Sequence, residues 1–248
     1  MIRPAWRARL QKPKIKHLLH RRRASSRDAS NVETMSHRPV SNSRDSIRMF
    51  DSELLEALSK IPPWAPLAVF MPVFAFITWK ALVVGGLGLP VYLACFAGGL
   101  LVWTGTEYFL HRFLFHWLPP GKLGARIHYI FHGVHHDHPN DALRLVMPPS
   151  VSVPLAFGFY QVFGLLVAPP MLYGFFAGFI IGYVTYDTLH YALHHHTFDN
   201  PLFKWLKRNH MQHHFVSPAT GYGVSSPLWD YIMGTRRKAA ATTGARIA

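Results

Sequence analysis

Four long apolar stretches constrain the fold of this chain more than any other feature of its sequence. They cover residues 64–84, 89–108, 151–168 and 171–189. At a rise of about 1.5 Å per residue, a helix of roughly 20 residues crosses the 30 Å hydrocarbon core of a bilayer. The stretches have no polar face at helical period, which disfavours a soluble bundle. Only 15% of the residues are charged, against roughly 25% in soluble domains. We therefore expect an all-α integral membrane protein with four transmembrane helices.

The positions of the cationic residues predict how these spans are oriented. The turns at residues 85–88 and 168–170 carry no Lys or Arg, so the spans form two hairpins. Apart from Lys80, the cations of the chain precede the first span, lie between the second and third, or follow the fourth. By the positive-inside rule both termini and the 111–150 segment face the cytosol. The expected location is a multi-pass one, with a bacterial inner membrane favoured and the endoplasmic reticulum if the protein is eukaryotic.

Most of the net charge of +14 belongs to the N-terminal region. Residues 1–48 hold 13 of the 26 Lys and Arg against three acidic residues, so they contribute 13 − 3 = +10. A basic tail of this kind is typical of a solvated segment near anionic lipid, and we expect no nucleic-acid partner. The predicted organisation is a disordered basic tail over 1–50, a membrane domain over 51–238 and a disordered C-terminal tail over 239–248. A short amphipathic helix is expected over residues 52–60.

Histidine is the unusual residue of this sequence. Fourteen of the seventeen histidines fall between His111 and His214, near the predicted cytosolic ends of the spans. Ten of them form four spaced clusters, which read H-x-x-x-x-H, H-x-x-H-H, H-x-x-x-H and H-x-x-H-H along the chain. The ten are His111, His116, His132, His135, His136, His190, His194, His210, His213 and His214. A lone histidine is rarely a ligand, but four spaced clusters at one membrane face indicate a metal site.

Helical spacing predicts how the clusters present their rings. Offsets of three and four residues lie on one face, so each H-x-x-H-H can direct three imidazoles toward one point, and His190 and His194 form a similar pair. His111 and His116, five residues apart, lie about 140° apart on a straight α-helix. They could therefore serve two different ions, or the helix could deform. Ten imidazoles exceed what one ion accepts, which predicts a dinuclear site in a cytosolic helical cap.

Several other residues are candidates for supporting roles. Asp187 and Glu107 precede His190 and His111 by three and four residues, so either carboxylate could orient a ring N–H, although helix capping or a surface ion pair is an equal alternative. The remaining histidines are not expected to bind metal as a set: His128, His138, His195 and His196 are spares, and His17, His20 and His37 lie in the tail. Cys95 is the only cysteine, which excludes a disulfide framework and a cysteine metal cluster.

At these clusters the sequence resembles the fatty acid hydroxylase superfamily, and within it the fatty acid 2-hydroxylases. The likeness covers roughly residues 50–237 and extends beyond the histidines. It includes the segments EYFLHRFLFHW, HGVHHDHPNDALRLVMPP, YDTLHYALHH, RNHMQHHF and GYGVSSPLWDYIMGT. The resemblance implies that the ten histidines hold two metal ions, iron in the active enzyme, with zinc as a substitute in isolated protein. It also implies four spans under a cytosolic catalytic cap.

The activity implied by the resemblance is O2-dependent hydroxylation of carbon 2 of a fatty acid or of a ceramide acyl chain. Many eukaryotic members carry a cytochrome-b5-like domain with an H-P-G-G motif, which this tail lacks, so we expect a separate electron donor such as a cytochrome b5 or a ferredoxin. The substrate is expected in an apolar slot, for which Phe113, Tyr129, Phe131 and Trp229 are candidates. The alternatives are a sterol or carotenoid hydroxylase or desaturase with similar clusters and, less favoured, a metal carrier.

Overall fold

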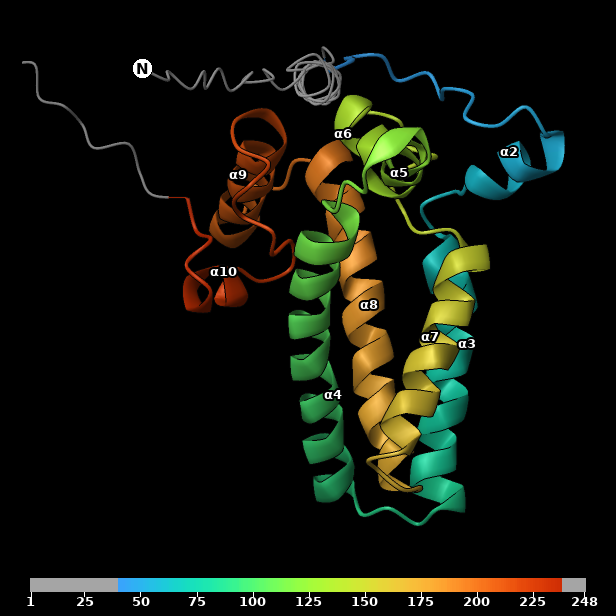
Figure 1. Ribbon diagram of the computed structural model, residues 1–248. Coiled ribbons are helices and arrows are strands. Elements are labelled where there is room, and N and C mark those ends of the chain that lie inside the picture. Colours follow the sequence, from blue (N-terminus) through green and yellow to red (C-terminus); the bar gives the residue numbers. More distant parts are fainter. Residues whose placement is uncertain (1–39, 238–248) are drawn as a thin grey trace, which may run out of the picture. The chain divides into compact units, whose positions relative to one another are not determined.

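The computed structural model describes residues 40–237, and every regular element among these residues is a helix (Figure 1). The prediction of an all-α chain is therefore confirmed for this part of the sequence. In chain order the elements are α2 (Glu53–Ser59), α3 (Ala65–Trp79), η1 (Lys80–Val84), α4 (Leu89–Phe109), η2 (Leu110–Phe115), α5 (Gly121–His128), η3 (Tyr129–Gly133), α6 (Val134–Asp137), α7 (Pro149–Gly164), α8 (Met171–His195), α9 (Pro201–Phe215) and α10 (Leu228–Ile232). The η elements are π-helical turns that continue the preceding α-helix.

The four apolar stretches form four long helices, α3 with η1, α4 with η2, α7 and α8. Proline occupies the first or second position of α3, α4 and α7, where its missing N–H has no intrahelical partner to lose. Residues 65–84 and 89–115 are long and apolar enough to cross a bilayer. α7 is shorter, at 16 residues. The helices that begin at Leu89 and Met171 run on past the predicted ends of the spans to Phe115 and His195.

The outer surfaces of these helices are apolar. Only 17% and 22% of the most apolar windows of residues 65–84 and 89–115 are buried within the protein, so neither resembles the core helix of a soluble protein. Large apolar side chains are exposed on α3, α4 and α7 alike, as Phe76, Leu101 and Phe157 show. Exposed apolar surface of this extent requires an apolar surrounding.

The centre of the bundle is α8, which packs along α4 and α3. Two glycines let α4 and α8 approach backbone to backbone. A Cβ atom on Gly99 would lie 1.8 Å from the carbonyl oxygen of Phe175, and one on Gly178 would lie 1.9 Å from that of Phe96. Close approach through small residues is the usual way in which helices associate in lipid, where apolar burial gives little driving force.

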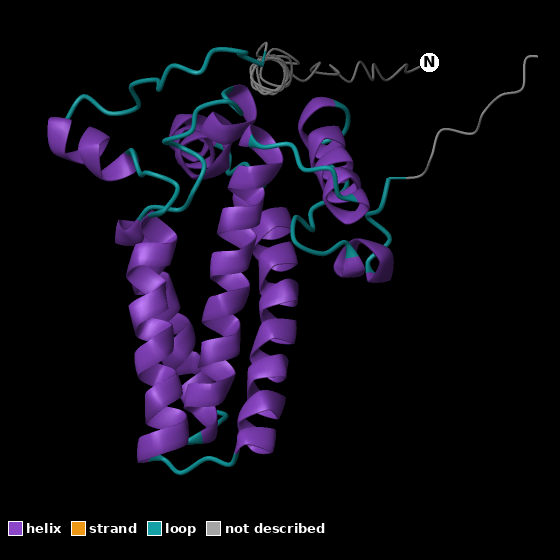
Figure 2. Cartoon of the chain, turned by 180° about the vertical axis from the view of Figure 1, so that it is seen from behind, coloured by secondary structure: helices purple, strands orange, loops and turns teal. Residues whose placement is uncertain are grey.

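The shorter helices collect at one end of the bundle and form a cap. In Figure 1 and in the reverse view of Figure 2, α5 and α6 lie beyond the ends of α4 and α8, α9 lies beside the same end of α8, and the two short hairpin turns lie at the other end. The cap carries all the segments between the second and third long helices and after the fourth. It is therefore built from the same segments that the sequence assigned to the histidine clusters.

Residues 40–50, which the sequence analysis assigned to the disordered tail, contact the cap. The amide of Ser41 donates to the carbonyl of Asp137 at 2.8 Å, the amide of Ile47 donates to a carboxylate oxygen of Asp141 at 3.2 Å, and Met49 is buried. Residues 40–50 therefore pack with the cap. The amphipathic helix expected over 52–60 is confirmed as α2, with Ser52 as its N-cap. The tail predictions for 1–39 and for the C-terminal segment lie outside the described residues.

Candidate metal centre

The first histidine cluster lies on a π-helical turn. α4 widens into η2, and the amide of His116 donates to the carbonyl of His111 five residues earlier, at 3.2 Å. A turn closed by an i→i+5 bond brings residues five apart onto the same face. Of the two possibilities left open by the spacing, deformation of the helix is the one observed.

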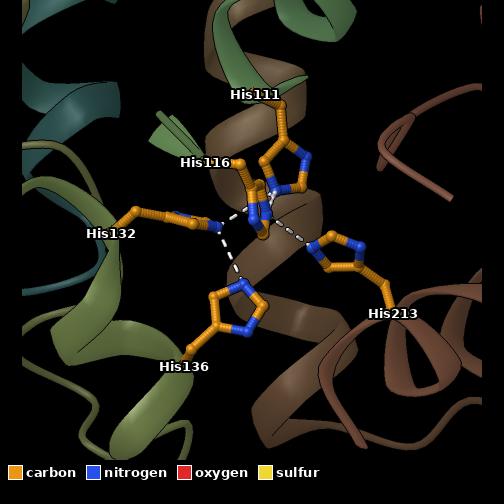
Figure 3. A group of neighbouring side chains, drawn as sticks. All are labelled: His111, His116, His132, His136 and His213. Atoms are coloured by element: carbon orange, nitrogen blue, oxygen red, sulfur yellow. Dashed lines mark hydrogen bonds between the residues drawn. The ribbon is translucent and has the colours of Figure 1, made fainter. Parts of the chain in front are cut away.

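Five imidazoles converge beside this turn. His111, His116, His132, His136 and His213 form the first group (Figure 3), and their candidate ligand nitrogens all lie within 4.8 Å of one another. The Nε2 atoms of His111 and His132 are 3.1 Å apart, and those of His116 and His213 are 3.0 Å apart. The members come from four separate elements, η2, η3, α6 and α9, and from the residue that ends η2.

The second group also contains five imidazoles. They are His135, His190, His194, His210 and His214, again with candidate ligand nitrogens within 4.8 Å of one another. The Nε2 atoms of His194 and His210 are 2.8 Å apart. The two groups are neighbours, because the rings of His136 and His214, one from each, stack with centroids 4.2 Å apart.

Each H-x-x-H-H cluster is divided between the groups, so the prediction that its three imidazoles point at one ion is wrong. His132 and His136 join the first group while His135 joins the second, and His210 and His214 join the second group while His213 joins the first. Helical spacing contributes to the division, because residues i and i+4 are about 40° apart around the axis whereas the residue at i+3 is about 100° from i+4. Which group each ring joins is then decided by how α6 and α9 face one another. His190 and His194, also four apart, stay together as expected.

The imidazoles are held in the neutral form that metals bind. Burial, reinforced by neighbouring imidazoles, lowers the pKa of His116 to about 2. Burial likewise lowers the pKa values of the cap histidines His132, His135, His136, His210, His213 and His214. A neutral ring offers a lone pair to a cation, whereas an imidazolium cannot.

Backbone carbonyls fix the tautomer of two histidines in the first group. The Nδ1–H of His111 donates to the carbonyl of Tyr222 at 2.5 Å, and the Nδ1–H of His213 donates to the carbonyl of Thr220 at 2.8 Å. Their Nε2 atoms therefore carry lone pairs that point into the group. In the second group the Nε2 atoms of His135 and His190 are buried without a hydrogen-bond partner. Converging lone pairs repel unless a cation lies between them, so this donor set fits metal ions.

The two acidic residues proposed to orient histidine rings have other partners, and that hypothesis is wrong. Glu107 accepts hydrogen bonds from the amides of Val224 and Ser225 and from the Ser225 hydroxyl. Asp187 accepts from the amide of Met147 and from the Tyr183 hydroxyl. Each buried carboxylate thus anchors a distant segment on a long helix. For His111 and His213, the ring N–H is instead held by a backbone carbonyl. No sequence pattern reveals such a carbonyl.

The spare histidines remain outside both groups. His128 pairs through Nδ1–H with the carbonyl of Trp117 at 3.2 Å, and the ring of His195 stacks on Tyr191 with centroids 4.5 Å apart. His138 and His196 are also absent from the two groups. The tail histidines lie outside the described residues.

An apolar cavity of about 710 Å³ reaches both groups. His132 of the first group and His135 and His190 of the second line it. The rest of its wall is mostly apolar and comes from α2 and the residues before it, η2, η3, α6, α7, α8 and the loop before α7. Among its members are Leu55, Leu58, Leu114, Phe115, Ile130, Val151, Pro154 and Leu155. The volume lies within the range of roughly 300–1,000 Å³ that is usual for small-ligand sites.

Only one of the four aromatic residues proposed for the slot lines this cavity. Phe131 does, whereas Phe113, Tyr129 and Trp229 do not. Trp229 instead covers Gly105 of α4 and donates from Nε1 to the hydroxyl of Thr104 at 3.0 Å. These three side chains were chosen for their proximity in sequence to the histidines, and proximity in sequence does not say which way a side chain points.

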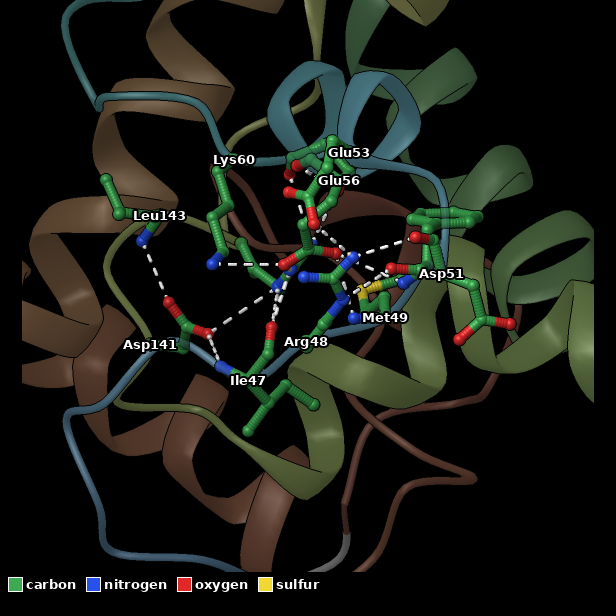
Figure 4. Close-up of polar contacts among 12 residues, drawn as sticks. Ile47, Arg48, Met49, Asp51, Glu53, Glu56, Lys60, Asp141 and Leu143 are labelled. Carbon is green, nitrogen blue, oxygen red and sulfur yellow. Dashed lines mark hydrogen bonds and ion pairs between the residues drawn. The ribbon is translucent and has the colours of Figure 1, made fainter.

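A buried ionic cluster, which the sequence analysis missed, holds one wall of the cavity. Arg144 donates to Glu56 at 2.5 Å, to the Ser59 hydroxyl at 2.7 Å and to the carbonyl of Ile47, and its side chain is only 2% exposed. Figure 4 shows Lys60 directed at Glu56, with an ion pair of 3.0 Å. The cluster fixes α2 and the residues before it against the loop before α7. The only sequence feature that could have indicated this cluster is the presence of isolated charged residues next to apolar ones.

The Glu56 carboxylate is ionised in this cluster. Burial alone would raise its pKa, but the amides of Met49 and Phe50, the ammonium group of Lys60 and the guanidinium of Arg144 together lower the pKa to about 2. The ion pairs are thus formed at any pH near neutrality.

Comparison with known proteins places these features in a family context. Residues 96–235 match the family model described as fatty acid hydroxylase. The chain is 37% identical to the dihydroceramide fatty acyl 2-hydroxylase FAH1 of Arabidopsis thaliana, over 80% of this chain and 83% of that protein. It is 38% identical to the ceramide very long chain fatty acid hydroxylase SCS7 of Saccharomyces cerevisiae, over 80% of this chain and 52% of that one. It is 34% identical to the human fatty acid 2-hydroxylase, over 80% and 58%.

A solved structure agrees with these similarities. The fold matches that of full-length scs7p, in which only the hydroxylase domain is visible, with a TM-score of 0.71 and 38% sequence identity. The match covers 75% of this chain and 70% of that one. The relatives are hydroxylases of fatty acyl chains, and none of those named here acts by its name on a sterol or a carotenoid.

Proposed function

The chain belongs to the fatty acid hydroxylase family, and from this we propose that it is an O2-dependent membrane hydroxylase that inserts oxygen at carbon 2 of a fatty acyl chain. The acyl chain is that of a free fatty acid or of a ceramide-type sphingolipid, as the names of the relatives suggest. The observation that carries the proposal is the apolar cavity that ends on both groups of five imidazoles.

We propose the ten histidines as ligands of two iron ions, one in each group. Support comes from the neutral state of the cap imidazoles, from the converging ring nitrogens and from the family. Imidazole also suits zinc, which is expected to replace iron in isolated protein. When bound, the iron ions would supply the oxidising chemistry that amino-acid side chains lack for an unactivated C–H bond.

The residues of the chain orient the ligands and position the substrate. The carbonyls of Tyr222 and Thr220 hold the rings of His111 and His213 so that Nε2 faces inward. The apolar cavity wall excludes water and receives the acyl chain. Because carbon 2 is bonded to the acyl carbonyl carbon, the head end of the substrate must lie beside His132, His135 and His190 while the tail follows the apolar wall.

The proposed topology has four membrane spans in two hairpins, with the cap and both termini in the cytosol and the membrane domain over 51–238. Support for α7 and α8 as spans comes from their position beside α3 and α4 and from exposed apolar side chains such as Phe157 and Leu165 on α7. The positive-inside distribution of Lys and Arg supports the orientation. In this arrangement the cavity lies where the cap meets the bilayer, so that a lipid reaches it without crossing water.

Each turnover requires O2, two electrons and two protons, and yields one hydroxyl group on the acyl chain and one water. We propose an electron-carrier protein, either a cytochrome b5 or a ferredoxin, as the class of donor that supplies these electrons.

Lipid mass spectrometry tests the proposed function. The full chain is expressed in a host that makes no 2-hydroxy lipids, together with an electron donor, beside a variant that combines His135→Ala with His190→Ala. We expect 2-hydroxy fatty acids only with the unmodified chain. Hydroxylation at another carbon would contradict the regiochemistry, and hydroxylated sterols or carotenoids without any 2-hydroxy acid would contradict the substrate class.

A further inference from the structure

A second hollow, of about 320 Å³, reaches the histidines from a different direction. It lies between α9 and the segment that carries α10, and no residue that lines it also lines the apolar cavity. In Figure 1, α9 and α10 lie on one side of α4 and α8, whereas α2 and α7 lie on the other. Trp205, Arg208, Asn209, Gln212, His213 and Tyr231 are among the residues that line it.

The hollow is cationic. Arg208, Arg236 and Arg237 line it, and none of the three forms an ion pair within the described residues. The one carboxylate in its wall, that of Asp230, is buried and accepts hydrogen bonds from the amides of Tyr222 and Gly223 and from the Thr235 hydroxyl. Arg208 and Arg236 are exposed and Arg237 is half-buried, so the wall of the hollow carries more positive than negative charge.

The other side chains are of the kind that anchors protein partners. Trp205 and Tyr231 line the hollow, and the guanidinium of Arg236 lies 4.5 Å from the centroid of the Tyr231 ring. Trp, Tyr and Arg are the residue types enriched at the energetic centres of protein–protein interfaces.

One metal-binding imidazole connects the hollow with the first group. His213 and Thr220 both line the hollow, and the Nδ1–H of His213 donates to the Thr220 carbonyl at 2.8 Å. The opposite edge of the same ring places Nε2 3.0 Å from Nε2 of His116. A partner seated in the hollow would thus be separated from the first group by a single imidazole ring, on the side away from the lipid.

We propose that this hollow is the docking site of the electron donor, a small acidic protein that carries one electron at a time. The inference rests on the proposed function, because only a hydroxylase of this kind needs two external electrons per turnover. Two successive donors are oxidised by one electron each, and these electrons, two protons and O2 give the hydroxylated acyl chain and water. The arginines attract the donor and His213 lies on the path to the metal.

Binding of a donor to the full-length protein tests the proposal directly. The protein, in phosphatidylcholine nanodiscs, is titrated with two acidic probes, a soluble cytochrome b5 haem domain and a [2Fe–2S] ferredoxin, at low and high salt. Arg208→Glu is compared with Lys122→Glu, which reverses one exposed charge on α5 away from the hollow. We expect Arg208→Glu to weaken binding of at least one probe about tenfold at low salt, and the Arg208→Glu/Arg236→Glu double variant about 100-fold.

High salt should reduce the affinity of the unmodified protein and remove most of the difference between it and the variants. Equal losses for Lys122→Glu and Arg208→Glu would overturn the proposal, because the effect would then be one of net charge. Absence of binding by both probes would overturn it as well. Lipid mass spectrometry of the purified protein measures co-purified phosphatidylglycerol. If the arginine variants lose this lipid but keep donor binding, the hollow holds a lipid headgroup and the proposal is wrong.

A turnover measurement separates docking from chemistry. With a small chemical reductant in place of the protein donor, the Arg208→Glu/Arg236→Glu variant should make as much product as the unmodified chain. An equal loss with both reductants would contradict a docking role. If the unmodified chain makes no 2-hydroxy product with either reductant, the proposed function fails, but the binding titration still decides whether the hollow takes an acidic electron carrier.

Discussion

Single hydrogen bonds decide which ring nitrogen of a histidine is available to a metal. The carbonyls of Tyr222 and Thr220 take the Nδ1–H groups of His111 and His213, which leaves Nε2 as the acceptor in both rings. The segment that supplies these carbonyls is itself held by the Glu107 carboxylate on α4, through the amides of Val224 and Ser225. The orientation of these two imidazole rings therefore depends on the packing of the C-terminal segment.

Removal of one proposed ligand that lines the cavity should strongly lower turnover. We expect His135→Ala to lower the rate of acyl hydroxylation about 100-fold or more, since loss of even an outer partner of a metal ligand typically costs 10–100-fold. The matched control is His128→Ala, because His128 lies in the cap outside both groups. Rates are measured by product mass spectrometry with a chemical reductant. Comparable activity of the two variants would show that His135 is not a ligand.

The Glu56 carboxylate should stabilise the cavity wall in a pH-dependent way. Its pKa in the folded protein is about 2, below its ordinary value of 4.5. The stabilisation is therefore complete above pH 4.5 and is lost as the pH falls from 4.5 toward 2. Glu56→Gln should destabilise residues 47–60 by about 2 kcal/mol at neutral pH and remove this acid dependence.

Hydrogen exchange of residues 47–60 measures the effect of Glu56→Gln. Glu53→Gln is the control, because Glu53 forms only an exposed ion pair with Arg48. Exchange in Glu56→Gln that is no faster than in Glu53→Gln would show that the ionic cluster does not hold the wall.

Among the secondary-structure elements, two π-helical turns lie next to the candidate metal centre. η2 carries His111 and is followed by His116 as its C-cap, and η3 carries His132 directly before α6. A regular α-helix would separate His111 and His116 by about 140°, so the wide turn is what brings both into the first group. Such turns are frequent at functional sites.

Helices α4 and α8 pack too closely to accommodate a side chain at the glycines between them. Gly178→Ala would place a Cβ atom 1.9 Å from the Phe96 carbonyl oxygen, and we expect a loss of about 3 kcal/mol as the helices separate. Gly158→Ala on α7 meets no atom within 4 Å and should leave stability unchanged or slightly raised. Thermal unfolding in detergent compares the two variants, and equal melting temperatures would contradict the packing described.

The cavity wall on α7 should select the acyl chain. Val151→Trp fills part of the cavity, so we expect kcat/KM to fall about tenfold or more for long acyl chains and less for short ones, while metal content is unchanged. Phe157→Trp is the control, because Phe157 is 64% exposed on the same helix and does not line the cavity. An equal effect of the two variants on all chain lengths would place the substrate elsewhere.

For the molecule as a whole, the sequence predicted the elements better than their contacts. Apolar length indicated the four long helices, and the spacing of histidines indicated a metal site, because both signals are local and periodic. The division of each H-x-x-H-H cluster between two groups depends on how α6 and α9 face one another, which is a tertiary property. The backbone amides that pair with Asp187 and Glu107 are 40 or more residues away in sequence, as those of Met147 and Val224 are.

The residues that line the cavity and the hollow, and the ion pair behind the cavity wall, were the hardest to predict from the sequence. The pairing of Arg144 with Glu56 joins positions 88 residues apart, and neither lies in a recognisable pattern. Phe131 was distinguished from Phe113 and Trp229 only by the direction of its side chain. The cationic hollow likewise forms only when α9 and the segment around α10 are folded together.

The central claim is that the two groups of imidazoles hold two ions independently, and metal content per chain tests it most directly. The full chain is purified after expression with iron, and metal is measured by mass spectrometry against protein concentration from amino-acid analysis. We predict about two ions per unmodified chain. His116→Ala/His213→Ala in the first group and His194→Ala/His210→Ala in the second should each retain about one. A saturated ratio of about one in the unmodified chain, or two ions in either variant, would contradict the account.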